Sequence, residues 1–170
     1  MEYVLKMESL NDIKDRLSGK ELADYHHALS WKENSKKLFD AATDIDSFKI
    51  AVKWCGVNGN VTRTVDVDHF NEFVELLWNN IDNIKKGIFE LDDFKLSNGK
   101  KPISWVSKMC HIINSKDYPI IYDERVRMYY KLKDLKGFIK KMNEVKEYFK
   151  NETDNFFYEY DAAIWAIDNK

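Results

Sequence analysis

Apolar side chains recur at intervals of three and four residues along most of this chain, which is the spacing of one face of an α-helix. The spacing is sustained through the segment His69–Lys86, at Phe70, Phe73, Val74, Leu77, Trp78, Ile81 and Ile84. The chain has 170 residues with 6 Gly and 2 Pro, and 44% of its residues are hydrophobic. This is enough to bury one continuous core, so the sequence predicts a single compact all-α domain over residues 1–170.

The same spacing predicts where the helices lie. We expect them at Leu10–Leu17, Leu22–Leu29, Trp31–Ala42, Asp46–Cys55, His69–Lys86, Pro102–Asn114, Tyr122–Leu132, Lys136–Lys150 and Asp154–Ile167. The segment Val61–Val67 alternates like a strand but is short, and we expect it to be an extended connector. Asp66 or Asp68 is placed to cap the helix that follows.

The sequence also argues against several classes of protein. No segment approaches the roughly 18 apolar residues of a membrane span, and the charged N-terminus lacks the apolar stretch of a secretory signal. Cys55 and Cys110 are too few for a disulfide framework, and Cys110 with its neighbour His111 lacks the paired spacing of a zinc site. We therefore expect a cytoplasmic protein that has no membrane association, no metal site and no cofactor.

Charge is distributed unevenly along the chain. Residues 95–150 hold 14 Lys and Arg against 6 Asp and Glu, a net charge of +8, whereas the segments before and after carry −6 and −4. Phosphate binding needs a local positive face, so the basic segment 95–150 is the candidate surface for DNA. A second interpretation remains open, in which these lysines form the solvated side of an amphipathic helix.

The segment Ile103–Val126 has the most specific pattern, an apolar helix with Lys108, then a turn at Pro119, then Asp123. Burial on an apolar helix favours the neutral, nucleophilic form of a lysine, and proline fixes the turn before the carboxylate. Lys108 and Asp123 could thus meet across a cleft between two consecutive helices. The structural alternative is a Lys–Asp salt bridge, or Asp123 as a helix cap beside an exposed lysine.

This segment resembles bacterial proteins related to 8-oxoguanine DNA glycosylase, which are similar to the helix-hairpin-helix DNA glycosylase superfamily. The resemblance lies in Ser107-Lys108, His111, Asn114, Tyr118-Pro119-Ile120, Asp123 and Val126, and in the ending FYEYDAAIWAI at 157–167. It implies a helix-hairpin-helix glycosylase-like fold and a base-excision activity. Lys108 would attack the sugar C1′ of a flipped nucleotide, and Asp123 would support departure of the base.

The resemblance also implies contacts with the nucleic acid. The flipped base would stack on an aromatic ring, for which Trp105, Tyr118 and Tyr122 are the candidates. The leading hypothesis further predicts a basic cleft around Lys100, Lys101, Arg125 and Arg127.

Two alternatives stay open. The superfamily has a Gly-x-Gly hairpin that grips a phosphate, and this chain has Lys100–Trp105 there, with Gly99 upstream. This favours a non-catalytic helical protein of phage, mobile-element or defence origin that binds nucleic acid or another protein on the same scaffold. A third interpretation is an oligomeric module whose acidic N-terminal half docks on the basic segment of a neighbour.

Overall fold

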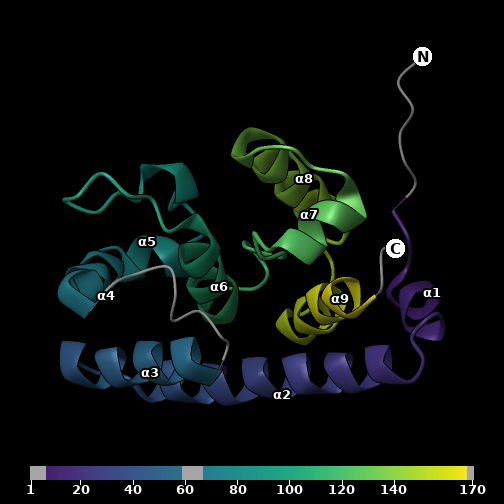
Figure 1. The fold of residues 1–170 in the computed structure, drawn as a ribbon, viewed down its shortest axis with the longest axis horizontal. Helices are drawn as coiled ribbons and strands as arrows, with labels where there is room; N and C mark the ends of the chain where they lie inside the picture. Colours follow the sequence, from purple (N-terminus) through teal and green to yellow (C-terminus); the bar gives the residue numbers. More distant parts are fainter. Residues whose placement is uncertain (1–6, 59–66, 168–170) are drawn as a thin grey trace.

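The computed structural model describes residues 7–58 and 67–167. Every regular element in these two ranges is helical, which confirms the predicted all-α class (Figure 1). The helices are α1 (Leu10–Asp15), α2 (Lys20–Ala41), α3 (Ile45–Asn58), α4 (Phe70–Asn79), α5 (Ile81–Lys85), α6 (Ile103–Ile113), α7 (Glu124–Tyr130), α8 (Leu135–Tyr148) and α9 (Asp154–Ala166). Two short 3-10 helices, Val67–His69 and Leu91–Asp93, precede α4 and α6.

The long helix α2 is the base on which the other helices are assembled. It runs along one edge of the molecule, with α9 over its N-terminal half and α3 beside its C-terminal half (Figure 1). Helix α6 packs against α2 between these two groups, and α7 packs on α9. One continuous helix therefore brings the middle and the C-terminal end of the chain to a common surface.

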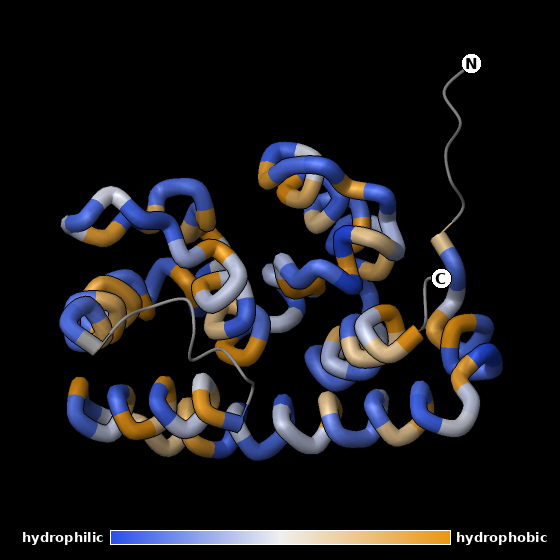
Figure 2. The backbone as a smooth tube through the Cα atoms, viewed as in Figure 1, coloured by the Kyte–Doolittle hydropathy of each residue, from blue (hydrophilic) through white to orange (hydrophobic). Residues whose placement is uncertain are grey.

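Helix α2 corrects a sequence prediction. Its buried residues follow a regular spacing of three and four, at Tyr25, Ala28, Lys32, Ser35 and Phe39. Two of these five residues, Lys32 and Ser35, are polar, so the sequence does not show one continuous apolar face over the length of α2. Figure 2 shows hydrophilic and hydrophobic positions mixed along the helix. The predicted boundary between helices at Leu22–Leu29 and Trp31–Ala42 is therefore wrong, because the stripe continues through Lys32.

The predicted central helix His69–Lys86 is also divided. Helix α4 ends at Asn79 and α5 begins at Ile81, because the backbone at Asn80 (φ −104°, ψ 7°) leaves the helical range. The side-chain amide of Asn80 donates to the carbonyl oxygen of Leu76 at 2.8 Å. Such a side chain offers the backbone a local alternative to helical hydrogen bonds, which explains the break.

The remaining helices lie close to their predicted positions. Helix α6 and the turn that follows it, around Ser115–Tyr118, agree with the sequence prediction, and α7, α8 and α9 begin within two residues of the predicted starts. Most of the predicted connector, 61–66, and the candidate cap Asp66 lie outside the described residues. Among the described helices, none combines the length and apolarity that a membrane crossing requires.

Gly87 ends α5 in a conformation that only glycine adopts easily. Its φ is +74°, its N–H donates to Ile84 O, and the N–H of Ile88 donates to Asn83 O, which together form a Schellman motif. A Cβ added at Gly87 would overlap the side chain of Asp117, at 2.7 Å from Asp117 Cβ. Gly99, with φ +84°, has no atom within 4 Å of such a Cβ.

This contrast gives a matched pair of variants. Gly99→Ala introduces backbone strain alone and should lower the free energy of unfolding by about 1 kcal/mol. Gly87→Ala adds a steric overlap and should cost about 1–3 kcal/mol more. Urea denaturation followed by circular dichroism measures both, and equal costs for the two variants would contradict the packing at Gly87.

Candidate functional site

A pocket of about 80 Å³ lies where α2, the end of α3, α6, the segment before α7, and α9 meet. Two tryptophans line it, Trp31 of α2 and Trp165 of α9. Its lining also holds two lysines and two carboxylates, together with four further residues: Lys32, Lys108, Asp123, Asp161, His27, Ala28, Asn58 and Ile121. Aromatic faces, cations and carboxylates thus converge in one small volume, which is the usual composition of a ligand site.

Lys108 and Asp123 line this pocket because a hydrogen bond joins the residues that precede them. The N–H of Tyr122 donates to Ser107 Oγ at 2.9 Å, and Ser107 Oγ in turn donates to the carbonyl oxygen of Ser104. Ser107 is buried on α6, so the bond fixes the segment before α7 against that helix. Lys108 and Asp123, from two consecutive helices, therefore line the same pocket, although no ion pair joins their side chains.

Asp123 has a structural role as well as a place in the pocket. It is the N-cap of α7, where its Oδ1 accepts from the N–H of Arg125 at 2.9 Å. Its own N–H donates to the carbonyl oxygen of Ile121 at 2.8 Å. Neither Oδ2 of Asp123 nor the ammonium of Lys108 has a hydrogen bond or an ion pair with the described residues. The cap thus uses one carboxylate oxygen and leaves the other without a partner among the described residues.

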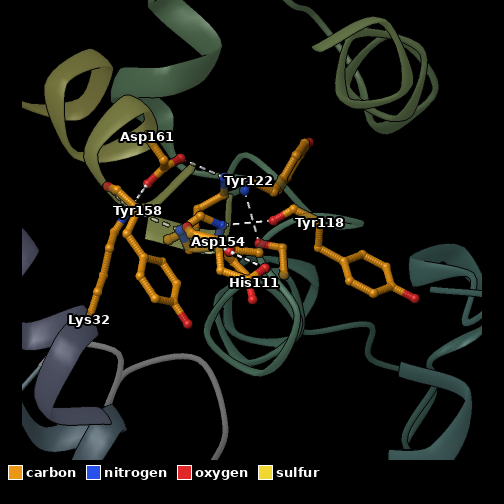
Figure 3. Close-up of polar contacts among 10 residues, drawn as sticks. Lys32, His111, Tyr118, Tyr122, Asp154, Tyr158 and Asp161 are labelled. Atoms are coloured by element: carbon orange, nitrogen blue, oxygen red, sulfur yellow. Dashed lines mark hydrogen bonds and ion pairs between the residues drawn. The ribbon is translucent and has the colours of Figure 1, made fainter. Parts of the chain in front are cut away.

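Lys32 forms the polar floor of the pocket, and it is buried with 1% of its surface exposed. Its Nζ donates to Asp161 Oδ2 at 2.6 Å, to His111 Nε2 at 3.0 Å and to the carbonyl oxygen of Tyr158 at 3.2 Å. Figure 3 shows this network, in which Lys32 reaches from α2 to Asp161 on α9 and to His111 on α6. An ammonium group has three protons, and all three are used.

The geometry assigns the protons of this network. Nδ1 of His111 lies 2.7 Å from the carbonyl oxygen of Tyr118, which can only accept, so Nδ1 carries the proton. Nε2 then has a lone pair and accepts from Lys32. Burial, together with the charge of Lys32, holds the pKa of His111 well below its usual value, which keeps the imidazole neutral. Burial also lowers the pKa of Lys32, although the adjacent Asp161 opposes this shift.

The two lysines of the pocket therefore differ in what they can do. The three hydrogen bonds of Lys32 make it a structural cation, and none of its protons is left for a ligand. Lys108 is half-buried and has no partner among the described residues. Of the two, Lys108 is the lysine that still has hydrogen-bonding capacity for a ligand in the pocket.

Two of the three aromatic residues predicted to stack on a base lie in the core. Trp105 is 3% exposed and stacks on Phe73 with ring centroids 4.4 Å apart. Tyr118 is also 3% exposed, and its hydroxyl donates to the carbonyl oxygen of Phe89. Neither ring has a free face, so the packing leaves Tyr122 as the partly exposed ring of the three.

The predicted basic residues have different surroundings. Lys100 is exposed, and Lys101 is exposed but pairs with Asp92 at 3.3 Å. The guanidinium of Arg127 lies over the ring of Tyr122, 4.7 Å from its centroid. Arg125 donates to the carbonyl oxygen of Trp165, pairs with Asp24 at 3.5 Å, and lies 4.5 Å from the centroid of the Trp165 ring. Arg125 therefore supports a wall of the pocket, whereas Lys100 and Lys101 do not line it.

Lys108 and Asp123 are the lining residues that the sequence predicted, and the eight others include two tryptophans and a buried lysine and aspartate: Trp31, Trp165, Lys32 and Asp161. Lys32 carries a signal in the sequence, because it lies three and four residues from positions of a helical stripe that are otherwise apolar or small. A charged residue on a buried stripe must be paired, although the sequence alone does not identify the partner. Asp161 carries the same kind of signal within the apolar run of α9.

The described residues contain no group of three or more His, Cys, Asp or Glu side chains that could hold a metal ion. Cys55 and Cys110 are both buried and unbonded, and burial raises the pKa of the Cys55 thiol to about 12. Neither thiol is therefore available as a nucleophile or a metal ligand in this fold.

Comparisons with protein-family models, with curated proteins and with solved structures each find no match to this chain.

The buried imidazole predicts a pH dependence of stability. In the unfolded chain His111 binds a proton below pH about 6.5, whereas in the folded chain it stays neutral. The unfolded state thus binds more protons in this range, and its contribution lowers the free energy of unfolding by up to about 1.4 kcal/mol per pH unit as the pH falls below about 6.5. We therefore expect the free energy of unfolding, measured by urea denaturation, to change less steeply with pH between pH 7.5 and 5.5 in His111→Gln than in the parent protein. His26→Gln, at an exposed histidine, is the control. Identical slopes for the parent and His111→Gln would contradict the assignment.

The buried ion pair predicts a second effect on stability. Lys32→Met leaves Asp161 buried without its cation and should lower the free energy of unfolding by about 3–5 kcal/mol. Lys32→Met/Asp161→Asn removes both charges and should recover most of that loss. The control is Lys36→Met, one turn further along α2, where the lysine donates to Ile113 O at 3.0 Å and is more exposed. That variant should cost about 1 kcal/mol. A Lys32→Met cost no larger than that of Lys36→Met would contradict the network.

Proposed function

We propose that this chain is a DNA-acting enzyme with a helix-hairpin-helix glycosylase-like fold, which removes a damaged or modified base at the pocket described above. The observation that carries the proposal is the position of Lys108 and Asp123. They are fifteen residues apart in the sequence and line one pocket, and the lysine has no partner among the described residues. An unpaired amine and a fixed carboxylate that line one pocket are the two groups that covalent catalysis at a sugar carbon uses.

The reaction assigns one role to each side chain. The neutral amine of Lys108 forms a bond to C1′ of a flipped nucleotide while the bond between C1′ and the base nitrogen breaks. The base leaves with the bonding electron pair and takes up a proton. The Lys108 nitrogen then loses a proton, and the C1′–O4′ bond breaks with its electron pair going to O4′, which takes up a proton. The sugar ring is thereby opened, and C1′ and Nζ form a protonated imine. The carboxylate of Asp123 stabilises the positive charge that develops on the sugar as the base departs.

The tryptophans provide surfaces on which a base can stack. Trp31 is fixed because its Nε1–H donates to the carbonyl oxygen of Cys55 at 3.1 Å. Trp165 is supported by the guanidinium of Arg125. Stacking on an aromatic side chain is worth about 1–3 kcal/mol per base, and ordered rings lose little entropy on binding. We therefore assign base stacking to Trp31 and Trp165, in place of the core residues Trp105 and Tyr118.

The basic segment supplies charge for the phosphate backbone. Lys131, Lys133, Lys136 and Lys140 are exposed between the end of α7 and the middle of α8, and none forms an ion pair with another described residue. By contrast, Lys141, Lys146 and Lys150 pair with carboxylates. The first group is the part of the basic segment that is free to bind phosphates by releasing counterions.

A second function, a non-catalytic protein that binds nucleic acid on the same scaffold, is favoured by the loop before α6. The N–H and the hydroxyl of Ser97 both donate to the carboxylate of Glu72, and Lys101 pairs with Asp92. These loop groups already have partners within the chain, so they are not free to grip a phosphate. On this hypothesis Lys108 contributes no covalent chemistry.

Trapping with borohydride tests the enzyme hypothesis. The parent protein, incubated with duplexes that carry abasic sites or a panel of modified bases and then reduced, should form a covalent adduct visible by denaturing electrophoresis. Lys108→Gln should abolish the adduct. Asp123→Asn keeps an acceptor for the Arg125 N–H and should slow adduct formation by about 10²–10⁴-fold. Lys116→Gln, at an exposed lysine outside the pocket, is the control.

Two results would contradict the enzyme hypothesis: no adduct with any substrate of the panel, or an adduct that persists in Lys108→Gln. Binding of duplex DNA that weakens with added salt, without adduct formation, would favour the non-catalytic function. In that case Lys108→Gln should leave the affinity unchanged.

A further inference from the structure

We propose that Asp161 is a positioning residue, which holds Asp123 in place in the pocket that Lys108 also lines, although Asp161 is far from both in the sequence. This inference rests on the proposed function for its catalytic meaning. Its structural part, that Asp161 fixes the location of Asp123, stands independently of any activity.

Two hydrogen bonds connect the carboxylate of Asp161 to the backbone of Asp123. Oδ1 of Asp161 accepts from the N–H of Ile121 at 2.8 Å. The carbonyl oxygen of the same Ile121 accepts from the N–H of Asp123 at 2.8 Å. Both polar groups of the Ile121 backbone are thereby used, one toward α9 and one toward Asp123. A displacement of Ile121 must therefore move Asp123 with it.

Asp161 is itself held so that it cannot rotate away. Its other oxygen, Oδ2, accepts from Lys32 at 2.6 Å, and the residue is 2% exposed. Lys32 also donates to His111 Nε2, and His111 Nδ1–H donates to the carbonyl oxygen of Tyr118. The buried ammonium thus links two anchors, one at Tyr118 and one at Ile121, which bracket the turn before α7 (Figure 3).

The arrangement fits a positioning role better than a direct chemical one. Both oxygens of Asp161 are engaged and the residue is almost completely buried, so it does not present a free carboxylate to a ligand. A buried ion pair often adds no more stability than an apolar pair of similar volume would. What an apolar pair cannot supply is an acceptor aimed at the N–H of Ile121.

Two double variants separate the positioning contact from the buried charge. Lys32→Met/Asp161→Asn removes both charges and keeps an oxygen that can accept from Ile121. Lys32→Met/Asp161→Leu removes both charges and the acceptor. Lys36→Met, which changes another contact between α2 and α6, is the control outside the network. Circular dichroism establishes the temperature at which all three variants are folded, and the measurements are made there.

The first measurement is the maximal rate of borohydride-trapped adduct formation, obtained from its dependence on the concentration of a duplex with which the parent protein forms the adduct. Misplacement of a catalytic group by about 1 Å can cost about 100-fold, so the leucine variant should be slower than the asparagine variant by at least about 10-fold, with a similar half-saturating DNA concentration. A smaller difference in maximal rate overturns the proposal. Lys36→Met should match the parent protein.

The second measurement is independent of activity. The amide of Arg125 donates to Asp123 Oδ1, so its hydrogen exchange, followed by NMR, reports the position of that carboxylate. Exchange of this amide should be at least about 10-fold faster in the leucine variant than in the asparagine variant, after normalisation to the most protected amides. Equal exchange at Arg125 overturns the positioning role.

The two measurements distinguish the two hypotheses. If the parent protein forms no adduct, the proposed function fails, and Arg125 exchange alone decides whether Asp161 places Asp123. If the leucine variant does not fold, Lys32→Met/Asp161→Ala replaces it under the same criteria, because the smaller side chain leaves room for water beside the Ile121 amide.

Discussion

The rest of this structure depends on the hydrogen bonds of the buried Lys32 ammonium. This ammonium lies on the inner face of α2 and donates to groups on α6 and α9, so one side chain joins three helices from the beginning, middle and end of the chain. A buried cation is tolerated only where acceptors surround it completely. Because all three protons of Lys32 are accepted, the relative positions of the three helices are fixed by geometry as well as by apolar packing.

The same network determines what the pocket can do. One lysine of the pocket uses all three of its protons in hydrogen bonds, whereas the other, Lys108, has no partner among the described residues. The anchors at Tyr118 and Ile121, with the bond from Tyr122 to Ser107, restrain the turn that ends at Asp123. Asp123 is a helix cap and a pocket residue at once, so the two interpretations of its position in the sequence are compatible.

The local sequence pattern predicted the helices whose buried residues are mostly apolar, as in α6 and α9. It failed where polar residues occupy buried positions. Lys32 and Ser35 interrupt the apolar pattern of α2, so the sequence predicted two helices where the structure has one. Asn80 ends α4 through a side-chain hydrogen bond, which the spacing of apolar residues does not indicate. The sequence likewise did not indicate that Trp105 and Tyr118 are buried, because an aromatic side chain in a motif packs in a core as readily as it stacks on a ligand.

The sequence by itself determined the all-helical class, the positions of most helices, and the segment that carries Lys108 and Asp123, because each of these depends on residues close together in the chain. Only the tertiary structure decided which side chains complete the pocket. Trp31, Lys32, Asp161 and Trp165 come from the two ends of the described chain, and they meet at Lys108 because α9 packs across α2. The physical reason is that a buried charge requires a partner, while nothing local in the sequence specifies from which distant helix that partner comes.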